Sequence, residues 1–411
     1  MKILVLSPKN VLPPIDGGRI SIFNSTMSLA RRHNVFMAFP YSGLTTFEVE
    51  ELKAKYKSHG IEAITFEHDT GDRISGLIRN FFSGIPYKME KYFNKRFLIE
   101  LIELVRTEKF DFIYIHVAHM AYYGLELRNY FNGPLFLREH NIQYELLRQY
   151  YFNERNVFRK LVAYWQYKKT FDYEIDLWKK FESIFFISDI DMSMAQNGQK
   201  NQGILLYDGV ESNGDDTEVA KEDGSFIYSG GLDAIQNRKS LYYFIDKIWK
   251  RFHLEFPEQR LYLTGNTDET IEKGLGYSSS ELKGLNIKNL GFVDDIDGAI
   301  RSKKYFVSPT MLGSGLRIKV LKAMALRSVL FVSELDYKMV RFLEDMTNVV
   351  LFRNYEEFRD KFMALEADEG LYSRIGYNAL MLAKNKFNWD AHARTIEAAA
   401  EALINRRKQR V

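Results

Sequence analysis

The sequence predicts an α/β protein of two domains, each built on a parallel β-sheet. The chain has 411 residues, which is long enough for two domains of ordinary size. In each half, short apolar segments alternate with segments of helical periodicity, the pattern of a parallel sheet covered by helices. Between the halves, residues 211–225 (ESNGDDTEVAKEDGS) are acidic and polar, and they predict a linker or flexible loop.

The first domain is expected at 1–210 and begins with this alternation. A strand at 3–6 leads through a loop with prolines and glycines into a helix at 20–32. Further strands are expected at 35–39, 63–66, 112–117, 135–137 and 184–187. Helices are expected at 91–107 and, as one or two helices, within 145–182.

The alternation starts again in the second domain, expected at 226–385. Its strands are expected at 226–228, 260–263, 290–292, 305–307 and 329–332, and its helices at 241–252 and from about 316 onward. The final segment, 386–411, is expected to form a helix that packs back toward the first domain. Two such domains would form a cleft between the carboxyl ends of two sheets, and that cleft is the expected site.

The composition excludes several classes of function. The share of hydrophobic residues, 46%, is that of a globular protein and excludes a disordered or collagenous chain. Because 57 Lys and Arg residues stand against 54 Asp and Glu residues, no nucleic-acid partner is expected. The chain has no cysteine, which excludes disulfides, thiolate catalysis and cysteine-bound metals.

The sequence contains no segment that predicts secretion or membrane insertion. The first residues, MKILVLSP, lead directly into a strand without a long apolar region or cleavage site. No apolar run reaches the roughly 18 residues of a membrane-spanning helix. We therefore expect a cytoplasmic protein whose membrane contact, if it has one, is peripheral and at the inner face.

Basic and aromatic residues interleave between 73 and 96, which leaves two interpretations open. The stretch contains Arg73, Arg79, Phe81, Phe82, Tyr87, Lys88, Lys91, Tyr92, Phe93, Lys95 and Arg96. Cations near an anionic membrane contribute up to about 1 kcal/mol each and aromatic rings suit the interfacial zone, so one interpretation is a peripheral membrane contact. The other is an ordinary loop and helix with buried rings.

The strongest local signal is an anion-binding pattern in PTMLGSGLRIKVLKAMA. A strand end and the turn Gly313-Ser314-Gly315 precede a helix, whose first N–H groups and dipole attract negative charge. Arg317 and Lys319 add full charges suited to a diphosphate. The alternative is that both cations are solvated on a surface helix, although cations in a first turn oppose the helix dipole.

A second glycine loop, PPIDGGR, stands between the first strand and the first helix. It does not match the G-x-G-x-x-G fingerprint, which weakens a dehydrogenase interpretation. On their own, Gly17 and Gly18 are more typical of a simple turn.

Together these motifs resemble the retaining family 4 glycosyltransferases of the GT-B fold, in particular the branch with the motif GSG-x-R-x-K-x-x-E-A. The resemblance covers nearly the whole chain and includes PPIDGGR, FIYSGGLDAIQNRKSLYYFIDKIW, LYLTGN, NLGFVDD, SPTMLGSGLRIKVLKAMA and FNWDAHARTIE. It implies two Rossmann-like domains with parallel sheets facing a central cleft. It also implies transfer of a hexose, with retention, from a nucleoside-diphosphate sugar to an acceptor hydroxyl in cell-surface glycan synthesis.

The resemblance implies roles for residues of the first domain. Gly17 and Gly18 would face the donor phosphate and the transferred sugar, with Arg19 placed to help. His116, at the end of the strand, matches a family histidine near the transferred sugar. Without that match, a lone histidine in a strand is more often structural than catalytic.

The acceptor side is expected after the 135–137 strand, where Glu139, His140 and Asn141 follow one another. These polar residues lie at a strand's carboxyl end and could line the acceptor site. The acceptor implied by the resemblance is a glycan or a lipid-linked glycan.

In the second domain, the resemblance implies a site for the donor's diphosphate and nucleoside. The segment 290–295 would lie beside the nucleotide base. The residues implied to bind the donor are Gly230, Gly231, Gly313, Ser314, Gly315, Arg317 and Lys319.

Lys322 departs from the family pattern, because it stands where the family has a glutamate that binds the nucleotide's ribose. An ammonium only donates, so the loss of the usual hydrogen bonds would cost about 1.5–3 kcal/mol, roughly tenfold to a hundredfold in affinity. Three explanations of this lysine are open. The donor site is rebuilt for an unusual nucleotide sugar, Lys322 meets an extra phosphate or carboxylate, or catalysis has been lost. We expect activity; the alternative is a degenerate homologue that serves as a glycan-binding or partner subunit.

Two D-x-D patterns, at 189–191 and 295–297, are typical of metal sites in glycosyltransferases of the other common fold. Here we interpret them as loop or helix-cap residues. Cationic side chains and a helix dipole would serve the diphosphate instead, so no metal or other cofactor is expected. Asp208 also replaces a more usual asparagine, a change interpreted as minor.

Overall fold

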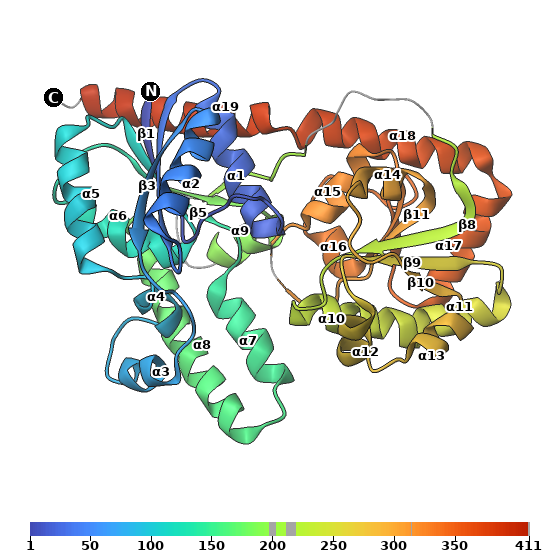
Figure 1. Cartoon of the computed structure of the whole chain (residues 1–411). Helices are drawn as coiled ribbons and strands as arrows, with labels where there is room; N and C mark the ends of the chain where they lie inside the picture. Colours follow the sequence, from blue (N-terminus) through green and yellow to red (C-terminus); the bar gives the residue numbers. More distant parts are fainter. Residues whose placement is uncertain (197–202, 211–218, 314, 410–411) are drawn as a thin grey trace. The chain divides into compact units, whose positions relative to one another are not determined.

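The computed structural model describes residues 1–196, 203–210, 219–313 and 315–409, and it divides the chain into two compact units (Figure 1). Unit 1 comprises Met1–Asp208 and Trp389–Val411, and unit 2 comprises Gly209–Asn388. Part of the predicted linker, 211–218, lies outside the described residues. The prediction of a linker is wrong for residues 222–225, where β8 (Glu222–Ser229) begins. Glu222 forms ion pairs with Arg260 and Lys303 of the neighbouring strands, which holds it in the sheet.

Unit 1 contains a parallel sheet with the strand order β3-β2-β1-β4-β5-β6-β7. The strands are β1 (Lys2–Leu6), β2 (Asn34–Tyr41), β3 (Ile61–Glu67), β4 (Phe112–His116), β5 (Leu135–Glu139), β6 (Ser183–Phe186) and β7 (Gly203–Leu205). The order reverses between β1 and β4. In open parallel sheets, ligands bind at such a switch point, outside the carboxyl ends of the strands.

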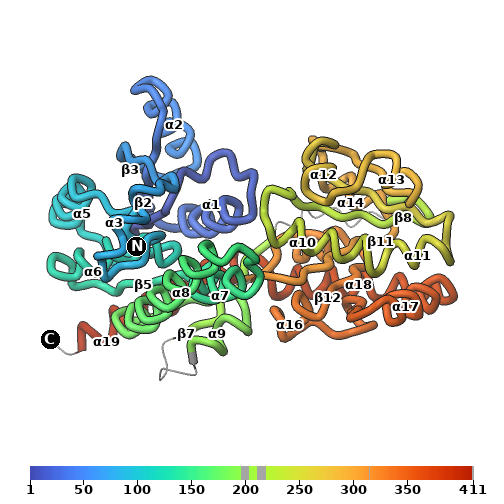
Figure 2. Tube along the Cα trace, turned by 90° about the horizontal axis from the view of Figure 1, so that it is seen from below, coloured from blue at the N-terminus to red at the C-terminus, as the bar shows by residue number. Residues whose placement is uncertain are grey.

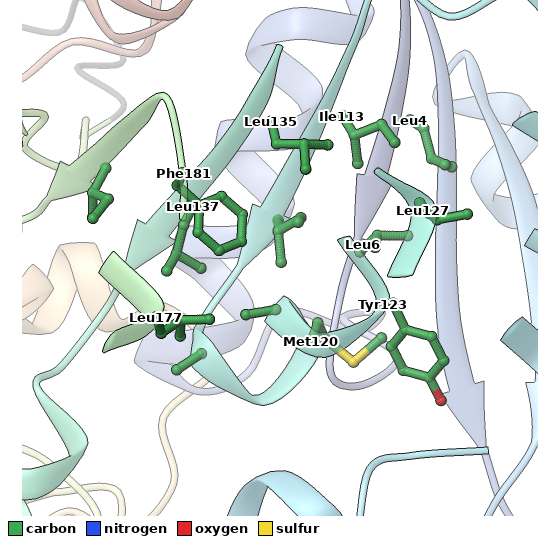
Figure 3. Close-up of a cluster of buried hydrophobic side chains, with 14 of the residues drawn as sticks. Leu4, Leu6, Ile113, Met120, Tyr123, Leu127, Leu135, Leu137, Leu177 and Phe181 are labelled. Atoms are coloured by element: carbon green, nitrogen blue, oxygen red, sulfur yellow. The ribbon is translucent and has the colours of Figure 1, made fainter. Parts of the chain in front are cut away.

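Helices cover this sheet. They are α1 (Gly17–Ala30), α2 (Thr46–Ser58), α3 (Ile74–Asn80), α4 (Tyr87–Glu90), α5 (Lys95–Thr107), the 3-10 helix η1 (Ala118–Met120), α6 (Ala121–Leu127), α7 (Gln143–Asn153), α8 (Val157–Trp178), α9 (Asp189–Gln196) and α19 (Trp389–Lys408). Figure 3 shows how Leu6 and Leu137 of the sheet meet Tyr123 and Leu177 from the helices in one buried cluster.

Unit 2 contains a second parallel sheet, with the strand order β10-β9-β8-β11-β12-β13, which reverses between β8 and β11. Its further strands are β9 (Arg260–Thr264), β10 (Ile287–Asn289), β11 (Lys303–Ser308), β12 (Val329–Ser333) and β13 (Val350–Phe352). The strand expected at 290–292 is wrong. Pairing with β9 ends at Asn289, and the apolar Leu290 and Phe292 beyond it are exposed.

The helical elements of unit 2 are α10 (Ile235–Tyr243), the π-helical η2 (Phe244–Trp249), α11 (Lys250–Glu255), α12 (Asp268–Leu275), α13 (Ser279–Gly284), α14 (Ile296–Arg301), α15 (Ile318–Ala325), α16 (Glu334–Lys338), α17 (Tyr355–Ala367) and α18 (Glu369–Lys386). The predicted helix at 241–252 therefore spans three consecutive helical segments. None of the helices in the described part of the chain has the length and apolarity needed to cross a bilayer.

The C-terminal helix α19 belongs to unit 1, although unit 2 precedes it in the sequence. Its residues Ala393, Ile396 and Ala400 join a buried cluster with Ile22 and Leu29 of α1. His392 adds polar contacts, since its Nε2 lies 2.8 Å from Ser25 Oγ. The last helix thus completes the packing of the first unit.

Candidate functional site

Two glycine-containing loops meet at the carboxyl edge of the unit 2 sheet, next to its switch point. Gly230 and Gly231 follow β8, and Gly265 follows β9. A Cβ on Gly265 would lie 3.8 Å from Gly231 N, so the loops are in close contact. Asn266 fastens them: its side chain accepts from Leu232 N at 2.7 Å and donates to Gly230 O at 2.9 Å. The sequence motif LYLTGN contains this asparagine, but sequence reasoning gave it no role.

The segment 290–295, predicted to lie beside the nucleotide base, adjoins these loops. Gly265 N donates to Gly291 O at 2.8 Å. Gly291 has a φ of 68°, a left-handed conformation that glycine adopts without strain. The structure therefore brings this segment and the Gly230-Gly231 loop to the same edge of the unit 2 sheet.

Lys319 places a positive charge beside these loops. It lies in the first turn of α15, and its Nζ is 4.3 Å from the centroid of the Tyr228 ring. A Cβ on Gly230 would lie 3.3 Å from this nitrogen. Burial lowers the pKa of Lys319 to about 8, although the Asp336 carboxylate opposes the shift. Within the described residues its ammonium makes no ion pair or hydrogen bond, so this charge is available to an anionic ligand.

Arg317 lies next to Lys319 but is already anchored. Its Nη2 donates to Leu312 O at 3.0 Å, and its Nε is 3.8 Å from Asp336 Oδ1. A Cβ on Gly313, which has a φ of 120°, would lie 2.2 Å from Nη2, so the guanidinium occupies space that only glycine leaves. Arg317 was expected in the first turn of this helix, which is wrong: the helix begins at Ile318, and Arg317 is its N-cap residue.

The rest of the predicted Gly-Ser-Gly turn is only partly described. Gly315 has a φ of 80°, which requires glycine in the same way as Gly313. Ser314 lies outside the described residues.

Asp336 is a site residue that sequence reasoning missed. It lies in α16, beyond the recognised motifs, and accepts a hydrogen bond from Ser308 Oγ at 2.6 Å. Burial raises the pKa of this carboxyl group, and the nearby Arg317 opposes that rise. Asp336 thus orients Arg317 and provides part of its counter-charge.

Lys322, the predicted departure from the family pattern, has a partner within the chain. Its Nζ lies 2.5 Å from Asp297 Oδ1, and both side chains are about one-third exposed. Asp297 belongs to the second D-x-D pattern. The first aspartate of that pattern, Asp295, caps α14 by accepting from Gly298 N at 2.8 Å, as expected. Among the described residues, no group of three or more histidines and carboxylates could hold a metal ion.

In unit 1, the predicted glycine loop forms the first turn of α1. Helix formation at Gly17 and Gly18 was not expected, and it is explained by Asp16, whose carboxylate caps the helix by accepting from Arg19 N at 2.9 Å. Arg19 Nε lies 3.2 Å from the same carboxylate, and Lys9 Nζ lies 3.3 Å from it. Gly18 therefore lies in a capped helix terminus, next to the Asp16 carboxylate and the two cations, Lys9 and Arg19, that contact it.

His116 ends β4 at the switch point of the unit 1 sheet. Its Nδ1 lies 3.1 Å from His140 Nε2, and both rings are buried. Burial lowers the pKa of each histidine well below its usual value, so the pair is neutral at pH 7 and one ring donates to the other. His116 Nε2 has no hydrogen-bond partner among the described residues. The next residue, Val117, has a strained φ of 61°, which is typical of functional sites.

The three residues predicted to line the acceptor side do not share one environment. His140 faces His116, whereas Glu139 accepts from Trp178 Nε1 at 3.1 Å in the opposite direction, as expected for alternate residues of a strand. Burial raises the pKa of Glu139 to about 7. Asn141 is partly exposed beyond the strand end. Of the three, His140 is the one that the structure brings to His116.

The replacement of the usual asparagine by Asp208 was interpreted as minor, but Asp208 has a structural role. Its carboxylate forms a fully buried ion pair with Arg138 of β5 and accepts from Ser21 Oγ at 2.7 Å. Sequence reasoning missed Arg138, which is hidden within an apolar strand. The pair fixes the last residue of unit 1 before the chain enters unit 2.

Comparisons with known proteins agree with this architecture. Residues 223–368 match the model of a family described as glycosyl transferases group 1. The chain is 22% identical, over 80% of its length and 82% of the relative's, to an uncharacterized 44.6 kDa protein in the cps region of Klebsiella pneumoniae.

Solved structures show the same fold. The Anabaena protein Alr3699/HepE in complex with UDP has a TM-score of 0.68 at 13% identity, covering 98% of this chain and 100% of its own. A glycosyltransferase from Rickettsia africae has a TM-score of 0.67 at 11% identity, covering 98% of each chain. The chain thus has an α/β fold with two parallel sheets of Rossmann type, like GT-B glycosyltransferases.

Proposed function

We propose that this protein is a retaining glycosyltransferase that moves a hexose from a nucleoside-diphosphate sugar to an acceptor hydroxyl in cell-surface polysaccharide synthesis. The observation that carries the proposal is the Lys319 ammonium, which makes no ion pair or hydrogen bond in the described chain and lies beside the glycine loops of unit 2. A diphosphate supplies the missing negative charge, and Arg317 adds a second cation.

The comparisons support the same proposal. The matched family model covers most of unit 2, where these residues lie. The Anabaena structure contains UDP, and the Klebsiella relative is encoded in a cps region. We therefore expect a uridine nucleotide as the first donor to test and a glycan or lipid-linked glycan as the acceptor.

The chemistry is expected to depend on charge stabilisation. Lys319 and Arg317 would stabilise the departing diphosphate, whose own oxygen would accept the acceptor's proton. In unit 1, neutral His116 would use its unpaired Nε2 to hold a sugar hydroxyl. Gly17, Gly18 and Arg19 would border the donor phosphate. No metal is proposed, so chelation by EDTA should leave turnover unchanged.

Calorimetry with UDP-, GDP- and dTDP-sugars tests the donor site. One of them should bind, and Lys319→Ala and Arg317→Ala should each weaken it by about tenfold to a hundredfold. Lys338→Ala, which changes an exposed lysine of α16, is the matched control and should bind normally. The anomeric configuration of the product, determined by NMR, tests retention.

A second candidate function is that of a catalytically degenerate homologue, which would act as a glycan-binding or partner subunit. Lys322 is the observation that favours it, since its charge is opposite to that of the expected glutamate. Failure of every nucleotide sugar to bind would support this candidate. Binding together with slow hydrolysis of the donor would support the enzyme.

A further inference from the structure

We propose that unit 1 docks on an anionic lipid bilayer through exposed apolar side chains on α3 and the beginning of α8. We name this region the α3/α8 surface and define it by Ile74, Ile78, Phe81, Phe82, Val157, Phe158 and Leu161. Each of these side chains is at least 62% exposed. Contiguous apolar exposure of this extent is uncommon in proteins that have no partner.

The first part of the surface is one side of α3 and the turn after it. Ile74, Ile78 and Phe81 recur at intervals of four and three residues, so they lie along one face of the helix. Phe82 extends this face and is 88% exposed. Asn80, on the other side, is buried and accepts from Gln166 Nε2 at 2.9 Å. The helix is therefore amphipathic with its apolar side directed away from the unit.

The second part is the beginning of α8, where α7 and α8 lie side by side as a hairpin (Figure 2). Val157 and Phe158 are exposed at its first turn, and Leu161 is exposed one turn later. Ala163 and Gln166 on the opposite side are buried. The apolar residues thus face away from the packing of the hairpin.

The two parts are joined into one surface. The Phe81 ring lies 5.3 Å from the Trp165 ring of α8, one turn beyond Leu161. Lys169 Nζ donates to Asn80 O at 2.8 Å, next to the hydrogen bond between Gln166 and Asn80. Figure 1 shows α3 next to α8 in the same part of unit 1. A flat partner could therefore contact both parts together.

The charges around this surface match anionic headgroups. Between Tyr150 and Lys169, five cations stand against one carboxylate, that of Glu154. From Ile74 to Phe82 the single charged residue is Arg79. Arg79 and Arg155 are exposed and form no ion pair within the described residues. An interfacial helix buries its apolar face at the boundary of the acyl chains while its cations contact the headgroups.

A second copy of the chain fits this surface less well. A two-fold contact through this surface would bring two surfaces of the same positive charge together, and like charges oppose association. Of the two interpretations of residues 73–96, the structure supports burial for Tyr87 and Tyr92, which are half-buried, and exposure for Phe81 and Phe82.

Flotation of the full chain with lipid vesicles tests the proposal. The protein should float with vesicles containing phosphatidylglycerol, should float poorly with phosphatidylcholine alone, and should be released by salt. The variants Phe82→Ser/Phe158→Ser and Arg79→Glu/Arg155→Glu should each weaken binding by about tenfold or more. All four positions are exposed, so folding should persist, and circular dichroism checks it.

Matched controls change exposed residues outside the surface. Phe47→Ser/Leu254→Ser replaces two apolar side chains, and Lys57→Glu/Arg374→Glu reverses two charges. Both controls should float like the unchanged protein. Absence of flotation, or equal losses in the controls, would overturn the proposal. The proposal would also be overturned if light scattering detected a dimer that Phe82→Ser/Phe158→Ser converts to a monomer. Flotation does not depend on nucleotide-sugar binding, so it can fail or succeed separately from the proposed activity.

Discussion

The Nζ of Lys322 lies 2.5 Å from the Oδ1 of Asp297, which joins the middle of α15 to the first turn of α14. Where a glutamate was expected on α15, the structure thus has a cation paired with a carboxylate from another helix. This carboxylate belongs to the chain itself, so it is not the extra phosphate or carboxylate of a ligand that the sequence left open for Lys322. We expect Asp297 to receive the ribose hydroxyls, with Lys322 holding it in position.

Asp297→Asn should therefore weaken binding of a nucleoside diphosphate. A charge-assisted hydrogen bond contributes about 1.5–3 kcal/mol, so we expect a loss of at least about tenfold in calorimetry. Lys322→Met should also weaken binding, because it leaves Asp297 without its orienting partner. Asp294→Asn, at an exposed position nearby, is the control. If Lys322→Glu tightens binding while Asp297→Asn has no effect, Lys322 merely displaces the usual contact.

Nucleotide affinity should fall at alkaline pH because of Lys319. Its pKa of about 8 means that the ammonium of the free protein loses its proton above that pH, and with it the attraction for a diphosphate. Calorimetry from pH about 7 to about 9 should show affinity falling with a slope of up to tenfold per pH unit above the pKa. Lys319→Arg, which stays protonated, should remove this slope. An unchanged slope in that variant would assign the titration to another group.

The lowered pKa of Lys319 makes the stability of the fold rise with pH, whereas it makes nucleotide affinity fall. The folded pKa of Lys319 is depressed from 10.5 to about 8, so the unfolded chain binds more protons between these values. Lys319 should therefore make the free energy of unfolding rise with pH across this window. Denaturant unfolding of the protein and of Lys319→Met, compared at the two ends of the window, isolates this contribution.

Gly313→Ala should weaken donor binding without unfolding the protein. The new Cβ would lie 2.2 Å from Arg317 Nη2, so the guanidinium must leave its contact with the Leu312 carbonyl. We expect a loss of about tenfold in nucleotide affinity. Gly276→Ala, at a left-handed φ of 70° where a Cβ meets open space, is the control for backbone strain. Equal affinities in the two variants would contradict the role given to Arg317.

Asp208→Asn should destabilise unit 1, because it leaves the buried Arg138 guanidinium without its counter-charge. Breaking a buried ion pair in this way costs about 3–5 kcal/mol. Glu51→Gln, which breaks an exposed pair with Lys55, should cost less than about 1 kcal/mol. Denaturant unfolding measures both variants. Similar values would mean that the buried pair contributes no more than a surface one.

The strands were the most predictable part of the fold. Runs such as 112–117 and 329–332 are continuously apolar because both faces of a parallel sheet are buried, and the structure places β4 and β12 there. The short strands β7 and β13 were missed. The prediction of a strand at 290–292 is wrong, because a phenylalanine indicates burial in the sequence whereas Phe292 is exposed in the structure.

The site was predictable where glycines and cations follow one another in the sequence. Lys319 and Gly230 were both expected at the donor site, and the structure brings them together. The partners that complete these groups come from distant parts of the chain. Asp336 for Arg317, Asp297 for Lys322 and His140 for His116 are tertiary contacts, and nothing in the local pattern around Arg317 or Lys322 indicates which carboxylate reaches them.

Because α19 covers α1 and follows unit 2 in the sequence, the ribosome makes the two parts of unit 1 at opposite ends of synthesis. Unit 2 is one uninterrupted segment and can fold while the ribosome still holds the chain. Until Ala393 and Ile396 emerge, however, the nascent first unit exposes Ile22 and Leu29, which makes it a client for chaperones during translation.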